Sequence, residues 1–337
     1  MKILKTLLYL LLVVVLVLVL LGFAGPKTYD VSRQVEIQAP KVVVMPYIKS
    51  LKKQNAWGPW GKEDPDMEVV YEGEEGQVGS SSAWKSDKVG SGRQEVTSIN
   101  GNTVETKLTF YMPWGESSST GYMHAADAEQ GTEVTWGFRG ENDFIGRIFG
   151  VFMNMDKSVG PMFTQGLDTL KAMVERDLSS AYQGYHVQVT EWPGKQYCAA
   201  RATVPMDEME AFFGASFGRI YPGVQAAGGQ VVGPASGLYY TWDETNKQTD
   251  MAAAVPVSGP VQVAQTEMIS VPADVALLID YYGNYDGLGA PHEAMDAFIK
   301  KTGVDSKSPV IEEYLTDPTT EPDTTKWLTK IYYLLNQ

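Results

Sequence analysis

The sequence predicts an α+β fold in which one apolar helix precedes two globular domains. Three observations lead to this expectation: an uncharged apolar run at the N-terminus, a series of alternating strands closed by a long amphipathic stretch, and a β-α-β-β pattern that occurs twice. With 337 residues, the chain has room for about two domains behind the apolar run. We expect an anchor at 1–26, a first domain at 27–175, a linker at 176–184 and a second domain at 185–337.

The N-terminal run extends from Leu7 to Ala24 without a charged residue. As a helix it would be about 27 Å long, close to the thickness of the apolar core of a bilayer. The apolar regions of cleaved signal peptides are shorter, roughly 7 to 15 residues, and Gly22-Phe23-Ala24 is a poor cleavage site. We therefore expect an uncleaved transmembrane helix, with a cleaved export signal as the alternative.

Charge gives the expected orientation and excludes some partners. Lys2 and Lys5 precede the apolar run, so the positive-inside rule places the N-terminus in the cytoplasm and both domains outside it, in the periplasm of a Gram-negative cell. The formal net charge is −14, and no basic cluster follows the first few residues. Nucleic acid is therefore not an expected partner, and only the helix should hold the membrane.

Cysteine and histidine usage argues against metal chemistry. The single cysteine, Cys198, excludes an internal disulfide and any multi-cysteine metal site, and its strand-like context is typical of a small buried side chain. His124, His186 and His292 are scattered and match no metal-binding spacing. We expect neither a metal nor another cofactor.

The first domain begins with a strand and short helical segments. Residues 29–40 alternate between apolar and polar side chains, which predicts a strand. Residues 41–53 have helical spacing, and Pro46 fits there only if it lies in the first turn. Residues 55–67 combine tryptophan, glycine and proline and are expected to form a loop that ends in an Asp64-Pro65-Asp66 turn.

Antiparallel strands and a long helix are expected next. Residues 69–139 are a series of alternating segments separated by turn residues, and Asn100-Gly101 predicts a hairpin. Residues 142–175 have helical spacing and predict a long closing helix, which Gly160-Pro161 could interrupt. Two segments place apolar side chains on one strand face: Leu108, Phe110 and Met112 in one, and Val134, Trp136 and Phe138 in the other.

This half resembles the START-like (SRPBCC) proteins of the polyketide cyclase/dehydrase type, in a membrane-anchored bacterial branch. The resemblance is carried by Ala39-Pro40 and by the stretches WGPWGKEDPDM, GQVGSSSAW, PWGESSSTGYM and GTEVTWGFRGEN. It implies a helix-grip fold, in which a curved sheet wraps the long helix and leaves an apolar cavity.

Aromatic side chains are the candidates for lining that cavity, because they supply large rigid contact area for an apolar ligand. Alternating aromatic residues on strands are also ordinary core residues, whereas a Gly-Pro loop is an unusual place for two large rings. The sequence contains no evident nucleophile–base pair, and Glu116, His124 and Asp127 fit solvated positions. The candidates are Trp57, Trp60, Trp84, Trp114 and Trp136.

The second half repeats one order of elements. Each copy of strand, helix, strand, strand has a helix with an apolar face, so the two copies should pair and leave a cleft between them. The first copy comprises residues 185–205, 206–228, 231–242 and 250–258, and the second comprises 264–285, 288–303, 308–318 and 327–335.

This half resembles the GyrI-like effector-binding domains. The resemblance is carried by GLYYTWDE, DMAAAVPV, YYGNYDGLGAPHEAMDAFIKKTG and PVIEEYLTDP, with Gly283-Asn284 where the family pattern has Gly-Pro. It implies a site in which a buried acid and aromatic side chains bind a lipophilic cation. Some GyrI-like proteins resemble small hydrolases in which a glutamate activates water. The matching positions are Glu312 for the acid, with Tyr314, Tyr240, Trp242 and Tyr282 for the walls.

Strand alternation selects between two neighbouring acids. Glu312 and Glu313 should point to opposite faces, and Tyr314 shares the face of Glu312. A carboxylate among aromatic rings attracts a delocalised cation by charge and by cation–π interaction. Alternatively, both glutamates are solvated on an edge strand.

Three functions are compatible with these features. The first is a membrane-anchored, non-catalytic binder of hydrophobic or amphipathic cationic small molecules. The second is a hydrolase or cyclase that acts on a small lipophilic compound in one of the two pockets. The third is a scaffold that docks partner proteins. No helix-turn-helix module with a basic face accompanies the second domain, which argues against direct transcriptional control.

Overall fold

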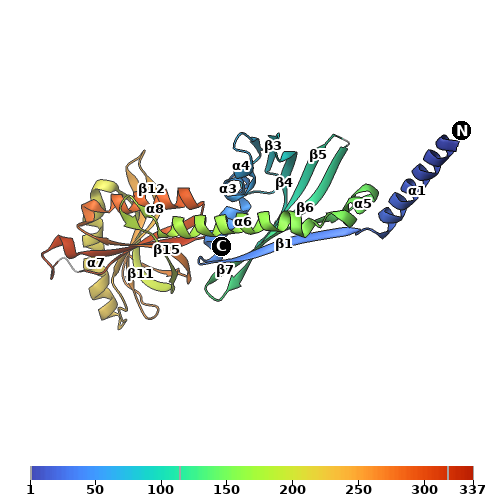
Figure 1. Ribbon diagram of the computed structural model, residues 1–337. Helices are drawn as coiled ribbons and strands as arrows, with labels where there is room; N and C mark the ends of the chain where they lie inside the picture. The colour runs from blue at the N-terminus through green and yellow to red at the C-terminus, as the bar shows by residue number, and fades with distance from the viewer. Residues whose placement is uncertain (1, 114, 317–318, 337) are drawn as a thin grey trace. The chain divides into compact units, whose positions relative to one another are not determined.

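A computed structural model describes residues 2–113, 115–316 and 319–336. The chain divides into two compact units, residues 1–176 and 177–337, and each unit contains its own large antiparallel sheet (Figure 1). The predicted α+β class is confirmed. Helix α1 (Lys2–Ala24) precedes the first sheet, is almost wholly exposed, and is long and apolar enough to span a membrane.

The first sheet has seven antiparallel strands in the order β1-β7-β6-β5-β4-β3-β2. The predicted hairpin is confirmed, with Gly101 in a left-handed conformation between two strands. The strands are β1 (Thr28–Ile37), β2 (Glu68–Glu72), β3 (Ser81–Ser86), β4 (Gly90–Asn100), β5 (Thr103–Met112), β6 (Gly115–Ala128) and β7 (Gly131–Glu141).

Three short helices follow β1: α2 (Lys41–Lys49), α3 (Leu51–Trp57) and α4 (Trp60–Glu63). Ser50 separates the first two, because its hydroxyl accepts from the amide of Lys53 and thereby begins α3. Two predictions are wrong here. Pro46 lies beyond the first turn of α2, and most of the predicted loop at 55–67 is helical.

The closing helix is divided into α5 (Phe144–Phe152) and α6 (Met155–Ser179). The predicted interruption at Gly160-Pro161 is wrong, because Pro161 lies within α6. The break comes earlier, where the side chain of Asn154 accepts from the amide of Lys157 and starts a new helix. The segment expected as a linker, 176–184, is helical as far as Ser179 and then forms part of a small hairpin, β8 (Ala181–Tyr182) with β9 (Tyr185–His186).

The second sheet has eight antiparallel strands in the order β10-β15-β17-β16-β12-β13-β11-β14. Helix α7 (Met209–Ala226) packs on β11 and β13, and helix α8 (Gly289–Thr302) packs on β15. The strands are β10 (Gln188–Trp192), β11 (Lys195–Pro205), β12 (Ala235–Asp243), β13 (Gln248–Pro256), β14 (Glu267–Val271), β15 (Asp274–Tyr282), β16 (Ser306–Tyr314) and β17 (Leu328–Leu335).

The strand order confirms the predicted duplication. It also shows that each copy contributes one strand to the edge of the other copy. Outward from the centre, β12-β13-β11 in one copy matches β16-β17-β15 in the other. The strand expected at 185–205 is broken at Pro193-Gly194, where Gly194 has a positive φ of 75°. The strand expected at 264–285 is also broken, at Pro272-Ala273 between β14 and β15. The two breaks allow β10 to pair with β15 of the second copy and β14 to pair with β11 of the first.

Strand β16 is an inner strand of this sheet, between β12 and β17. Glu312 and Glu313 on it are each only 4% exposed, so the alternative of two solvated glutamates on an edge strand is wrong. They point to opposite faces, as predicted. The carboxylate of Glu313 forms an ion pair with Lys195, whose ammonium group lies 5.0 Å from the centre of the Trp192 ring.

Removing one partner of this pair should destabilise the second unit. In Lys195→Met the carboxylate of Glu313 stays buried without a counter-charge, and we expect a loss of about 2–4 kcal/mol, since Lys195 is itself partly exposed. Urea denaturation of the full-length chain measures the loss. Adding Glu313→Leu should recover most of it, and Lys326→Met, which removes an exposed pair with Asp323, should cost under about 1 kcal/mol. Equal effects of the two lysine substitutions would contradict the prediction.

Candidate functional sites

A cavity of about 390 Å³ lies in the first unit, within the range typical of small-molecule sites. Its walls come from the concave side of the sheet, from α3 and α4, and from the first turns of α6. Most of the lining is apolar, including five methionines that adapt to differently shaped ligands. The α6 contribution consists of Met155, Val159, Met162 and Phe163.

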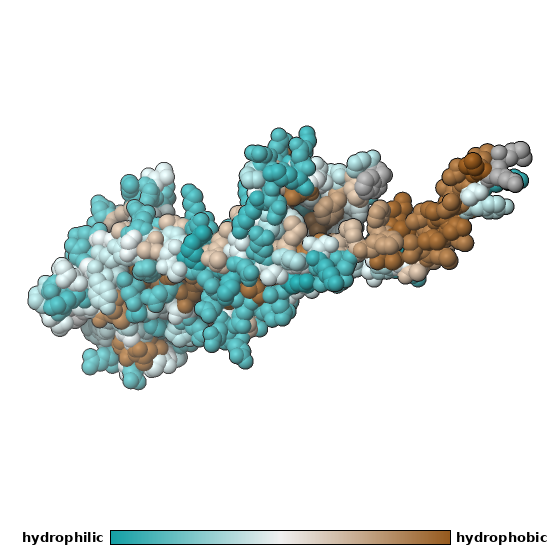
Figure 2. Space-filling model, in the orientation of Figure 1, coloured by the Kyte–Doolittle hydropathy of each residue, from teal (hydrophilic) through white to brown (hydrophobic). Residues whose placement is uncertain are grey.

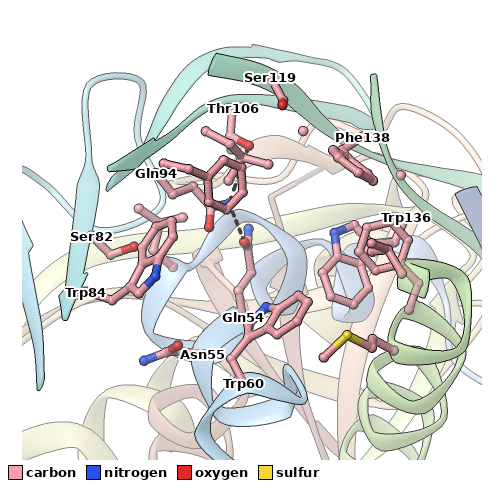
Figure 3. A pocket seen from close by; sticks show the side chains of 18 of the residues that line it. Gln54, Asn55, Trp60, Ser82, Trp84, Gln94, Thr106, Ser119, Trp136 and Phe138 are labelled. Atoms are coloured by element: carbon pink, nitrogen blue, oxygen red, sulfur yellow. Dashed lines mark hydrogen bonds between the residues drawn. The ribbon is translucent and has the colours of Figure 1, made fainter. Parts of the chain in front are cut away.

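The polar groups of the cavity are uncharged, and several of them are hydrogen-bonded to one another. The amide of Gln94 donates to the Gln54 side-chain oxygen at 2.9 Å and lies 3.4 Å from the Thr106 hydroxyl (Figure 3). The hydroxyls of Tyr29 and Ser119 are 2.6 Å apart. These groups can orient a polar end of a ligand, while most of the wall favours apolar atoms.

Four of the five predicted tryptophans line this cavity: Trp57, Trp60, Trp84 and Trp136. The fifth, Trp114, lies outside the described residues. Trp57 is fully buried, and its indole N–H donates to the Tyr47 carbonyl at 3.1 Å, so it also serves the core. Figure 3 shows Trp60, Trp84 and Trp136 around the glutamine pair.

The rings on one side form a contiguous stack. Trp136 lies parallel to Phe163 of α6 with ring centres 4.2 Å apart, and its edge meets Trp57 at 4.9 Å. Phe138 meets the edge of Phe163 at 5.7 Å. Because these rings support each other, the wall that they form is rigid, which lowers the entropy that a ligand must overcome on binding.

Charged side chains are absent from the described lining residues of the cavity. Asp127 pairs with Lys41 at 2.9 Å, and His124 contacts the Thr103 hydroxyl at an exposed position. Glu116 is exposed. The described walls of the cavity therefore offer no counter-charge for an ionic ligand, and they contain no carboxylate or imidazole for acid–base chemistry.

The second unit places Glu312 in a closed hydrogen-bond network. One carboxylate oxygen lies 2.8 Å from Nε2 of His292 on α8. The other accepts from the hydroxyls of Tyr314 at 2.7 Å and Tyr239 at 3.1 Å. Nδ1 of His292 lies 3.0 Å from the Tyr333 hydroxyl. The two ring nitrogens of His292 thus join the carboxylate of Glu312 to the hydroxyl of Tyr333.

Sheet geometry explains how the network fits under the aromatic side chains. Glu312 pairs with Gly237 on β12, and a Cβ at Gly237 would lie 2.7 Å from the hydroxyl of Tyr314. Glycine therefore leaves the space that the tyrosine hydroxyl occupies. Phe213 of α7 and Tyr285 meet the ring of Tyr314 edge-on, at 5.8 and 5.3 Å.

The predicted residues of the second site are only partly brought together. Tyr314 contacts Glu312 as expected. Tyr240 does not, because its ring lies over the guanidinium of Arg201 at 3.6 Å and packs against the core of the opposite face. Trp242 is 56% exposed and Tyr282 62% exposed, and neither bonds to the carboxylate in the described network.

A β-bulge in β12 accounts for the misplacement of Tyr240. The pairing with β13 shifts between Tyr239 and Thr241, so Tyr240 is the extra residue and alternation resumes beyond it. Tyr239 thus shares a face with Trp242, and their rings lie 6.3 Å apart. Sequence reasoning missed Tyr239, His292 and Tyr333. Alternation from Gly237 would have selected Tyr239, whereas His292 and Tyr333 reach Glu312 only through the tertiary fold.

Burial and the charge of Glu312 raise the pKa of Tyr239 and of Tyr314 well above the usual value for tyrosine. Burial also raises the pKa of Tyr197 and of Tyr333, and that of Tyr332 to about 12. These phenols therefore stay neutral in the folded protein, where they can donate hydrogen bonds at any physiological pH.

Two family descriptions match the sequence in tandem. Residues 28–175 match "Polyketide cyclase / dehydrase and lipid transport", and residues 186–335 match "GyrI-like small molecule binding domain". The chain carries a polyketide cyclase/dehydrase domain followed by a GyrI-like domain. The cavity belongs to the first of these and the Glu312 network to the second, and both families support a ligand-binding role. No curated protein matches the chain.

Solved structures match parts of the chain at low sequence identity. The C-terminal domain of EcmrR is 18% identical over 45% of this chain and 98% of its own, with a TM-score of 0.39. EcmrR in a DNA complex is 16% identical over 58% of this chain and 72% of its own, with a TM-score of 0.40. An uncharacterized conserved protein from Listeria innocua is 12% identical over 44% of this chain and 92% of its own, with a TM-score of 0.35. Likenesses at these scores say nothing of function, and the absence of a nucleic-acid partner stays a prediction.

The raised tyrosine pKa values predict a loss of stability at high pH. A folded tyrosine with a raised pKa keeps its proton where an unfolded one loses it, so the free energy of unfolding falls as pH rises above about 10. Below that pH the contribution is complete.

Ultraviolet titration of tyrosinate measures this effect. All 18 tyrosines should ionise in urea by about pH 11, whereas Tyr197, Tyr239, Tyr314, Tyr332 and Tyr333 should stay neutral in the folded chain. Tyr239→Phe should reduce the difference by one group. Complete ionisation of the folded chain at that pH would show that the phenols are not shielded.

Proposed function

We propose that the protein is a membrane-anchored, non-catalytic binder of small molecules with two sites of different selectivity. The polyketide cyclase/dehydrase domain takes a neutral hydrophobic molecule, and the GyrI-like domain takes a lipophilic cation. The observation that carries the first assignment is the 390 Å³ cavity, whose described walls contain no charged side chain.

The neutral character of the first ligand follows from desolvation. An ionic headgroup that enters this cavity would lose its hydration without gaining a counter-charge, which costs several kcal/mol. A neutral polar end would lose less, since Gln54, Gln94 and the Tyr29–Ser119 pair offer donors and acceptors. A single acyl chain with a hydroxyl-bearing end meets both conditions.

The second assignment rests on Glu312. Its partners are two phenols and one imidazole, and Glu312 is the carboxylate of this cluster, whose tyrosines contact the rings of Phe213, Tyr285 and Trp242. A delocalised cation gains from that charge and from the ring faces together. Entry requires the aromatic side chains above the carboxylate to move, which is consistent with the exposure of Trp242.

The geometry supports binding over hydrolysis or cyclisation. Protein donors already fill three of the roughly four acceptor positions of the Glu312 carboxylate, which leaves it little capacity to accept a hydrogen bond from water. The described lining of the cavity in the first domain has no carboxylate and no imidazole. Turnover of a bound compound in either domain would contradict the non-catalytic role, and ligand-free cavities in protein purified from cells would favour a docking scaffold.

Location at a membrane rests on α1. The helix has the length and composition to cross a bilayer, and the lysines that flank its start favour a cytoplasmic N-terminus with both domains on the other side. An anchor at this position holds both binding sites near a phase in which hydrophobic compounds concentrate.

The first site is tested with neighbouring serines on β6 that face opposite ways. Ser119 is buried in the cavity wall, whereas Ser118 is exposed. Monoolein, a neutral monoacylglycerol, should raise the melting temperature of the full-length chain in detergent, by an amount equivalent to about 2.7 kcal/mol at a hundredfold excess over Kd. Ser119→Trp should abolish the shift because the indole fills the cavity, and Ser118→Trp should preserve it.

Charge variants of the same ligand test the absence of a counter-charge. Oleate and oleylamine have an acyl or alkyl chain like that of monoolein, and both should bind to the first domain more weakly. A shift with monoolein that survives in Ser119→Trp, or a preference for oleate, would contradict the proposed site.

The second site is tested with tetraphenylphosphonium, a delocalised lipophilic cation. Glu312→Gln should weaken its binding about tenfold or more, because the buried charge is removed while the shape is kept. Glu293→Gln removes an exposed charge next to His292 on α8 and should leave the affinity within about twofold. Isothermal titration calorimetry measures both. Equal affinities for the Glu312 variant and the natural chain would remove this site from the proposal.

A further inference from the structure

Helix α5 (Phe144–Phe152) and the residue after it carry an unusual number of exposed apolar side chains. Ile145, Phe149 and Phe152 follow one another at helical spacing on one face, and Phe149 is 59% exposed and Phe152 73% exposed. Water-exposed patches of this kind mark a surface that another phase or molecule covers. The exposed apolar residues are Phe144, Ile145, Phe149, Val151, Phe152 and Met153.

This helix is attached to the end of α1. The backbone amide of Asn142 donates to the Lys27 carbonyl at 2.8 Å, and its side chain donates to the Pro26 carbonyl at 3.0 Å. The edge of the Phe23 ring meets the Phe144 ring, with centres 5.9 Å apart. The start of α5 therefore lies at the residues where the apolar run ends.

Small residues make this attachment close. Gly25 lies against the backbone of Arg147, and a Cβ at Gly150 would come within 2.7 Å of the Pro26 ring. Larger side chains at these positions would separate the two helices. In Figure 2 the hydrophobic surface runs from α1 onto the adjoining α5 without a hydrophilic gap.

We propose that α5 lies in the lipid–water interface beside the exit of α1, with Ile145, Phe149 and Phe152 inserted among the acyl chains. The inference rests on the proposed anchorage by α1. If α1 crosses the bilayer, its last residues are at the interface, and α5 is held at the same depth by the contacts just described. A short helix with an apolar face, capped by the polar side chain of Asp143, is suited to that position.

Lipid fits this surface better than a protein partner does. The exposed side chains of α5 continue those of α1, which is apolar around its whole circumference and needs lipid on all sides. Arg147 does not extend the apolar face, since its Nε donates to the Asn142 carbonyl near the start of the helix. The polar residues Asn142 and Asp143, which precede α5, and the apolar helix that follows them match the polarity gradient of an interface.

Spin labels at three positions of the full-length chain test the inference in phosphatidylcholine liposomes. Phe149→Cys reports on α5, Leu16→Cys on the middle of α1, and Asp168→Cys on an exposed position of α6. The natural Cys198 is buried, so the unsubstituted chain serves as the labelling blank. The measurement is the collision rate of each label with oxygen, which concentrates in lipid, relative to that with a water-soluble nickel chelate.

We expect the oxygen-to-nickel ratio at Phe149 to lie several-fold above that at Asp168 and below that at Leu16. A Phe149 label with the ratio of Asp168, while Leu16 remains lipid-exposed, would overturn the interfacial position alone. A Phe149 label shielded from both reagents would show that protein covers α5 and would also overturn it. A Leu16 label with the ratio of Asp168 would overturn the anchorage and this inference together.

Discussion

The buried carboxylate of Glu312 imposes the strongest constraint on the second unit. A charge on a residue that is 4% exposed is tolerated only if donors surround it. Here the donors come from β12, β16 and α8, so the helix of one copy and the strands of both copies must be in place together. Because β12 and β16 are the central neighbours of the eight-stranded sheet, the network lies where the two copies meet. The duplicated fold and the site are thus parts of one arrangement.

The first unit contains an unfilled cavity in place of a buried charged network. Its sheet and α6 enclose a volume that no side chain fills, and the described walls avoid charge altogether. The hydrogen bonds of Gln54 and Gln94 to each other and to neighbouring groups keep the cavity from carrying unsatisfied polar atoms when a ligand with few polar groups is bound. One chain therefore combines a cavity whose described walls carry no charge with a second site that contains the buried carboxylate of Glu312.

Much of this could be predicted from local patterns, and the exceptions have physical causes. Period-two alternation placed Glu312 and Tyr314 on one face, because β16 is regular beyond Val310. The expectation for Tyr240 came from the family resemblance, and it failed because the bulge in β12 makes Tyr240 the extra residue, with its side chain on the opposite face. The closing helix is divided at Asn154 by one capping hydrogen bond. The sequence instead favours a break at Pro161, two turns later, which the structure accommodates within α6. His292 could not be found locally, as it meets Glu312 across 20 residues of chain.

At two places in the sequence, only a few residues separate the region around α5 from residues that line the cavity. Tyr29, which lines the cavity, comes two residues after Lys27, whose carbonyl holds the start of α5. Met155, which also lines the cavity, follows two residues after the exposed Met153. An interfacial α5 would therefore place both cavity-lining segments within a few residues of the acyl chains. A hydrophobic molecule could then pass from the bilayer to the cavity over apolar surface, without the desolvation cost of crossing water. A neutral lining would then favour both the affinity for a hydrophobic ligand and the rate at which the ligand enters from the bilayer.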